Sequence, residues 1–221
     1  MRFLILGATG PSGILLVRKT LEVYPDASII LFARSPQKVP EDLTNNSSIT
    51  IIKGEFTDLD ILSNAIESSG GIDVVLSALG PLVNHPPGNV IATFYSHLID
   101  LMNKYDIKRI ILLGTASISD PKDKFSLVFK LLIAGVRFGA PNVYRDIVAV
   151  GEVIRTKGDA LDWTIVRVPL LTNNESEEVV AGHVGDGKTG TRLSRRGYAA
   201  FSVHEVEKRE WVKEAPLISY P

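Results

Sequence analysis

The stretch that decides the fold of this chain is Phe3-Leu4-Ile5-Leu6-Gly7-Ala8-Thr9-Gly10-Pro11-Ser12-Gly13. It begins as an apolar run, continues through three glycines, and is followed by a helix-like segment from Ile14. Glycine allows a tight turn after a strand and a close approach of the backbone to a ligand. The start of a helix presents unpaired N–H groups and a positive dipole end to an anion. The stretch therefore predicts a strand, a phosphate-binding turn and a helix, with ligand contacts from Gly7, Thr9, Gly10, Pro11, Ser12 and Gly13.

Length and composition restrict the classes of protein that remain. A chain of 221 residues has room for one α/β domain with a full core, but not for separate cofactor and substrate domains. It has no cysteine, and its four histidines show no paired spacing, so we expect no disulfide and no metal site. A net charge of −1 gives no indication of a nucleic-acid partner.

Apolar segments are too short to predict a membrane span. Only four apolar residues precede Gly7, and the run from Phe125 to Phe138 is interrupted by charges and is shorter than the ~20 residues needed. We expect this run to be a buried or lid helix. The sequence thus predicts a cytoplasmic protein with no membrane partner.

The second strand carries the signal for cofactor choice. Residues 28–32 are apolar in nearly every position, which is typical of a strand buried on both faces of a parallel sheet. An acid after this strand would accept the ribose hydroxyls of NAD, whereas a base accommodates the 2′-phosphate of NADP. Arg34, Ser35 and Lys38 follow, with no acid between Ile29 and Val39. The sequence predicts NADP(H), although Arg34 can also be a solvated loop charge.

Further apolar runs alternate with helical patterns along the whole chain. Strands are predicted at 49–53, 72–80, 109–113, 161–169 and 217–219, and helices at 59–68, 90–105 and 141–157. This order predicts an α/β fold, a single doubly wound Rossmann domain over 1–221 with a mainly parallel sheet of about seven strands.

Two motifs carry a resemblance to a known family. The glycine loop and Leu161-Asp162-Trp163-Thr164-Ile165-Val166-Arg167-Val168-Pro169 resemble the atypical short-chain dehydrogenases, in particular NmrA-like, biliverdin-reductase-B-like (flavin reductase) and averufin-oxidase-like proteins. Val168 departs from the family pattern, in which proline follows the arginine. The resemblance covers the whole chain and implies additional cofactor contacts from Glu55, Phe56, Ser77, Ala78, Leu79, Gly80 and Pro169.

The resemblance also implies catalytic residues. Thr115 matches the family position whose hydroxyl binds the substrate carbonyl, and Ser117 lies two residues later. A hydroxyl at the end of a strand can equally cap the next segment. Tyr144 matches the catalytic tyrosine, but Val148 stands where the family has a lysine that lowers the pKa of that tyrosine. Tyr144 is therefore expected to orient a substrate oxygen rather than to act as a strong base.

Three segments are expected to cover the substrate: residues 81–89, 118–141 and 170–192. The last is polar, rich in glycine and without periodicity, as loops over ligand sites often are. The candidate substrate-binding residues are His85, Phe125, Phe129, Phe138 and Leu170. Any one of the aromatic residues can equally belong to the core, and His85 can be simply solvated.

These patterns predict an NADP-dependent reductase or dehydrogenase that acts on a small apolar carbonyl or aromatic compound as a monomer or homodimer. The averufin-oxidase resemblance suggests fungal-type secondary metabolism. Two alternatives stay open. One is an NmrA-like redox sensor that binds NADP(H) and regulates without turnover. The other is a non-redox cyclase, dehydratase or epimerase on the same scaffold.

Overall fold

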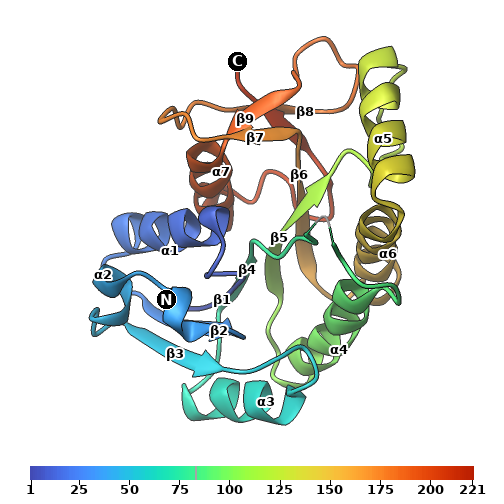
Figure 1. The fold of residues 1–221 in the computed structure, drawn as a ribbon. Helices are drawn as coiled ribbons and strands as arrows, with labels where there is room; N and C mark the ends of the chain where they lie inside the picture. The colour runs from blue at the N-terminus through green and yellow to red at the C-terminus, as the bar shows by residue number, and fades with distance from the viewer. Residues whose placement is uncertain (83) are drawn as a thin grey trace.

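The computed structural model describes residues 1–82 and 84–221, and a twisted sheet forms its centre (Figure 1). Among those residues the sheet has eight strands in the order β3-β2-β1-β4-β5-β6-β10-β8. In that order the strands are β3 (Ile49–Lys53), β2 (Ser28–Ala33), β1 (Arg2–Leu6), β4 (Val74–Ser77), β5 (Arg109–Thr115), β6 (Asp162–Val168), β10 (Leu217–Ser219) and β8 (Val180–Gly182). Neighbouring strands are parallel except β10 and β8. The chain runs outward from β1 to β3 and then returns to β4 on the other side of β1, which creates a switch point between β1 and β4.

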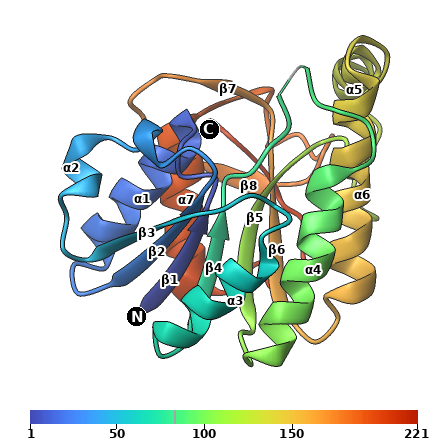
Figure 2. The same cartoon turned by 60° about the horizontal axis from the view of Figure 1, so that its bottom comes forward.

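Helices cover both faces of this sheet, as Figures 1 and 2 show. In chain order the described helices are α1 (Pro11–Val23), α2 (Glu41–Thr44), α3 (Leu59–Ser68), α4 (Val90–Lys104), α5 (Leu127–Gly139), α6 (Pro141–Lys157) and α7 (Arg195–Lys208), with a 3-10 turn at Pro36–Lys38. One core is formed between the sheet and α3, α4 and α6, and the other between the sheet and α1, α2 and α7. The predicted doubly wound α/β fold is confirmed.

Alternation along β1 explains why both faces are covered. Leu4 and Leu6 belong to the core beneath α4 and α6, whereas Phe3 and Ile5 belong to the core beneath α1 and α7. Successive side chains of a strand point to opposite faces, so an uninterrupted apolar run needs a layer of helices on each side.

The stretch 170–192, predicted as a loop, contains more regular structure than its sequence indicates. It includes β8, which pairs antiparallel with β10 and supplies the eighth strand, and β7 (Leu170–Thr172), which pairs with β9 (Arg192–Ser194) in a separate small sheet. Strands of three residues are too short to show a period in the sequence. Their conformation depends on partners far along the chain.

No single helix among residues 1–82 and 84–221 is both long and apolar enough to cross a membrane. Helices α5 and α6 satisfy the length and composition criteria only as a pair, and the pair is bent by 117°.

Candidate functional site

The glycine loop lies between the carboxyl ends of β1 and β4. Gly7 has a φ of +76°, and a Cβ there would lie 2.8 Å from the carbonyl carbon of Ala78. A Cβ on Gly13 would lie 2.0 Å from the carbonyl oxygen of Gly7. These contacts leave no room for a side chain at either position, so the two glycines hold the loop against β4 and α1 against the loop.

The loop leads directly into the N-terminus of α1. Gly10 is the N-cap residue of α1 and Pro11 is its first helical residue, and no side chain caps this end among the described residues. The first N–H groups of a helix have no partner within it, and proline at the first position has none to offer. The amides of Ser12 and Gly13 therefore remain for an anion. This cradle, which a Cβ would fill, fits the pyrophosphate of a dinucleotide.

Basic residues follow β2 at the same edge of the sheet. Arg34 and Lys38 are exposed, Ser35 is partly exposed, and neither basic group forms an ion pair with a described carboxylate. Because β2 is parallel to β1, Ala33 and Leu6 end at the same edge. The arrangement leaves two cations available for a phosphate beside the glycine loop.

The predicted contacts beyond β3 and β4 are only partly available to a ligand. Glu55 is exposed, and Phe56 is half-buried with its ring stacked on Phe94 at 4.7 Å between ring centroids. Ser77 is fully buried, and its hydroxyl lies 2.6 Å from the hydroxyl of Tyr95. The Ser77 hydroxyl thus has its partner inside the core, and the predicted cofactor contact at Ser77 stays a prediction.

The backbone of Ala78, Leu79 and Gly80 continues beyond β4 beside the glycine loop, and Pro169 follows β6 at the same edge.

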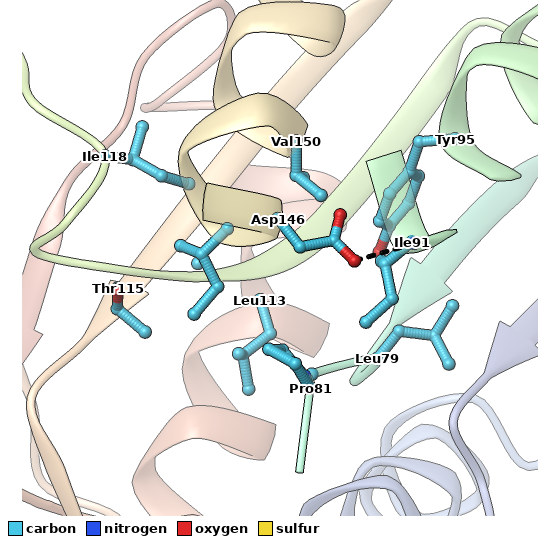
Figure 3. A pocket seen from close by; sticks show the side chains of 12 residues that line it. Leu79, Pro81, Ile91, Tyr95, Leu113, Thr115, Ile118, Asp146 and Val150 are labelled. Atoms are coloured by element: carbon cyan, nitrogen blue, oxygen red, sulfur yellow. Dashed lines mark hydrogen bonds between the residues drawn. The ribbon is translucent and has the colours of Figure 1, made fainter. Parts of the chain in front are cut away.

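An apolar pocket lies at the carboxyl ends of β4 and β5 (Figure 3). It is lined by Leu79, Gly80, Pro81, Ile91, Tyr95, Leu113, Gly114, Thr115, Ile118, Asp146, Ile147 and Val150. The polar side chains in this lining are those of Tyr95, Thr115 and Asp146. An apolar wall with a few convergent polar groups is the usual form of a small-molecule site.

Asp146 is the most strongly bound polar group of the pocket. Its side chain is buried, and its carboxylate accepts hydrogen bonds from the backbone amides of Ile91 (2.9 Å) and Ala92 (2.8 Å) in the first turn of α4. His85 Nε2 donates to the same carboxylate at 2.5 Å. Asp146 thus caps α4 from the neighbouring helix and fastens the loop that contains His85 to the edge of the pocket.

Tyr95 faces Asp146 across the pocket, as Figure 3 shows. Burial raises the pKa of the Tyr95 phenol far above its usual value, an effect that the hydrogen bond with Ser77 opposes and the nearby charge of Asp146 adds to. Tyr95 is therefore a neutral phenol at physiological pH, able to share a hydrogen bond but not to act as a base.

Of the predicted catalytic residues, the structure brings Thr115 into the pocket. Thr115 ends β5, and its hydroxyl accepts a hydrogen bond from the backbone amide of Ser117. Tyr144 is not in the lining. The face of α6 that meets the pocket bears Asp146 and Val150. The ring of Tyr144 lies instead beside Arg137, with its centroid 5.8 Å from the guanidinium. The catalytic role of Tyr144 stays a prediction.

The predicted substrate-binding residues do not meet at this pocket. Phe129 is buried under α5 against Val184 and Leu217, so it is a core residue. Phe125, Phe138 and Leu170 are largely exposed. The imidazole of His85 is largely buried and contacts Asp146, which itself lines the pocket. These five residues lie outside the lining of this pocket, and their role in binding a substrate stays a prediction.

Two polar residues of the pocket, Asp146 and Tyr95, were not among the predicted site residues. A signal existed for Asp146, since it interrupts the apolar stripe of α6 formed by Val143, Ile147 and Val150. Tyr95 offers no such signal, because an aromatic residue on an apolar helix face is normally core.

Comparison with known proteins agrees with this arrangement. Residues 7–209 match a family model described as NAD(P)H-binding. A short-chain dehydrogenase/reductase from Veillonella parvula, solved in complex with NADP, is 19% identical with a TM-score of 0.76, over 100% of this chain and 94% of that one. A Rossmann-fold NAD(P)-binding protein from Shigella flexneri is 23% identical with a TM-score of 0.71, over 100% and 93% of the two chains. An oxidoreductase from Lactococcus lactis is 17% identical with a TM-score of 0.76, over 100% and 91%.

These structural likenesses concern the fold, and the family match extends over most of the chain, from the glycine loop to the last helix. The chain belongs to the NAD(P)H-binding family.

Proposed function

We propose that the protein is a cytoplasmic NADP-dependent oxidoreductase of the atypical short-chain dehydrogenase type, acting on a small apolar carbonyl or aromatic compound. The observation that carries this proposal is the position of the apolar pocket directly beside the glycine loop, where Gly80 lines the pocket and Ala78 touches Gly7. Arg34 and Lys38, which are exposed and form no ion pair with another described residue, support NADP over NAD.

In this proposal the protein binds and orients the cofactor and the substrate, and NADPH, when bound, supplies the two electrons for reduction. Gly7, Gly13 and the start of α1 would hold the pyrophosphate, and Arg34 would hold the 2′-phosphate. Thr115 donates a hydrogen bond from its hydroxyl to the oxygen of a carbonyl substrate. The apolar lining around it excludes water, which strengthens that hydrogen bond.

Arg34→Ala is expected to weaken NADPH binding by about 10- to 100-fold and to leave NADH binding nearly unchanged. The guanidinium makes charge-assisted hydrogen bonds to phosphate, worth about 1.5–3 kcal/mol each, and NADH lacks that phosphate. Isothermal titration of both cofactors to both proteins measures the effect. Lys208→Ala, which removes an exposed cation at the end of α7, is the matched control. Equal affinity of the unmodified protein for NADH and NADPH would contradict the proposal.

Thr115→Val is expected to lower kcat by about 10- to 100-fold while NADPH affinity stays within about twofold, because valine keeps the shape but removes the donor. The rate of NADPH oxidation with a panel of apolar aldehydes, ketones and quinones measures it. Tyr144→Phe is the companion variant. A loss as large as that of Thr115→Val would support the family register, whereas an unchanged rate would remove Tyr144 from the mechanism. If Thr115→Val is as active as the unmodified protein, the role assigned to Thr115 is wrong.

A second candidate is an NADP(H)-binding sensor without turnover, resembling NmrA. The observation in its favour is Val148, which stands where the family has its catalytic lysine. The two functions separate in one assay, since a sensor binds NADPH but oxidises it with none of the tested substrates.

A further inference from the structure

Helix α5 exposes an apolar stripe to solvent. Phe138 is 81% exposed, Leu131 65% and Leu127 61%. These residues are four and seven positions apart, and since a helix turns by about 100° per residue they lie on one face. Phe125, just before the helix, adds another exposed aromatic ring. A contiguous exposed apolar surface of this kind indicates a site of interaction.

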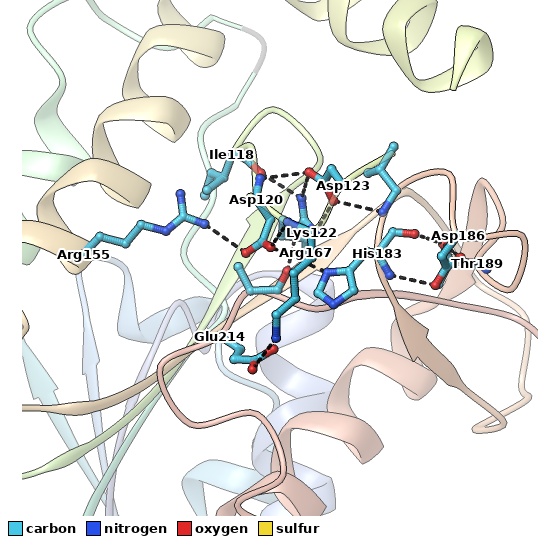
Figure 4. Close-up of polar contacts among 12 residues, drawn as sticks. Ile118, Asp120, Lys122, Asp123, Arg155, Arg167, His183, Asp186, Thr189 and Glu214 are labelled. Atoms are coloured by element: carbon cyan, nitrogen blue, oxygen red, sulfur yellow. Dashed lines mark hydrogen bonds and ion pairs between the residues drawn. The ribbon is translucent and has the colours of Figure 1, made fainter. Parts of the chain in front are cut away.

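The exposure of this stripe is not caused by a loose helix. Phe129, on the opposite side of α5, packs against Val184 and Leu217. The segment before α5 is tied down by Asp123, whose carboxylate takes two hydrogen bonds from Arg167 and one from the amide of Val184 (Figure 4). The helix is thus anchored on one side and presents the other side to the exterior.

Cations border the stripe, and acids are absent from the segment. Between Lys124 and Arg145 the chain has no Asp or Glu, while Lys130 and Arg137 lie seven residues apart on one edge of α5. The ammonium of Lys130 lies 4.5 Å from the ring centroid of Phe125. The charge of Lys130 therefore lies beside the exposed aromatic surface, although the chain as a whole has a net charge of −1.

We propose that α5 binds, parallel to the surface, to lipid bilayers that contain anionic lipids. An interfacial helix buries its apolar face at the boundary of headgroups and acyl chains and directs Lys and Arg toward lipid phosphates and carboxylates. A second copy of the chain is the poorer partner, because pairing two α5 helices about a twofold axis would bring their cations together without acids to neutralise them. The expectation of no membrane partner rested on the run from Phe125 to Phe138 being too short to span a bilayer, a criterion that does not apply to a helix lying in the interface.

The experiment is flotation of the purified full chain with vesicles of phosphatidylcholine alone and of phosphatidylcholine with phosphatidylserine. The protein is expected to float with the anionic vesicles and to bind less as salt rises. Leu131→Glu is expected to lower the partition coefficient at least about tenfold, and Arg137→Ala about fivefold. Ile61→Glu, at an exposed apolar position of α3, is the matched control and should bind normally. NADPH binding and thermal unfolding show that each variant is folded.

Three results would overturn this proposal. The first is absence of binding to anionic vesicles, and the second is equal binding to both vesicle types. The third is a concentration-dependent dimer in light scattering that Leu131→Glu abolishes, which would make a second copy the partner of α5. None of these results bears on NADPH binding, so the proposed function is tested separately.

Discussion

Asp146→Ala is expected to lower the free energy of unfolding by about 3–5 kcal/mol, the typical cost of removing one partner from a buried charged network. The buried carboxylate accepts two backbone amides of α4 and Nε2 of His85. Alanine leaves the two amides without a cap and the imidazole without a partner, in a region from which water is largely excluded. The variant should also release the loop around His85 from the edge of the pocket.

Urea unfolding followed by circular dichroism measures this loss. Asp146→Asn keeps one acceptor oxygen and should lose about half as much, because hydrogen bonds to a neutral oxygen are weaker than those to a carboxylate. Glu152→Ala is the matched control, since Glu152 is an exposed acid on the same helix. If the free energy of unfolding of Asp146→Ala is within about 0.5 kcal/mol of that of the unmodified protein, the cap does not stabilise the fold as its geometry indicates.

Asp123→Ala is expected to have an effect of similar size, about 3–5 kcal/mol, because it leaves a fully buried guanidinium without its counter-ion. The side chain of Arg167 is 0% exposed, and its Nη1 and Nη2 atoms lie 2.7 Å and 2.8 Å from the two oxygens of Asp123 (Figure 4). Arg18→Met removes one partner of an exposed ion pair with Asp42 and should cost less than about 1 kcal/mol. If Asp123→Ala and Arg18→Met lost equal amounts of unfolding free energy, the prediction that the buried ion pair contributes more than the exposed one would be wrong.

The same pair predicts how stability depends on pH. Burial alone would raise the pKa of Asp123, but the hydrogen bonds and charge of Arg167 outweigh burial and hold the pKa below its usual value. A depressed carboxylate pKa stabilises the fold above the unfolded-state pKa of about 3.9, and the contribution is lost as pH falls through the lower folded-state pKa. The unmodified protein should therefore lose stability in acid more steeply than Asp123→Ala. Thermal unfolding between about pH 2 and 7 compares the two slopes.

The sequence by itself determined the elements whose pattern is local. Helix α6 runs from Pro141 to Lys157 and β3 from Ile49 to Lys53, as their local sequence patterns predicted. The sequence also predicted the glycine loop. A strand, a turn that favours glycine and a helix start are all encoded within a dozen consecutive residues. The fold class then follows from the order of such elements.

Only the tertiary structure decided which side chains meet. Asp146 is distant in sequence from His85 and Ile91, and its role as a cap exists only because α6 packs beside the start of α4. Likewise, an apolar pattern shows that α5 is amphipathic but not whether a given face meets the core or solvent. Packing placed Phe129 inside, against Val184 and Leu217, and left Leu127, Leu131 and Phe138 outside. Contacts between distant segments depend on how whole elements fit together, which no local pattern specifies.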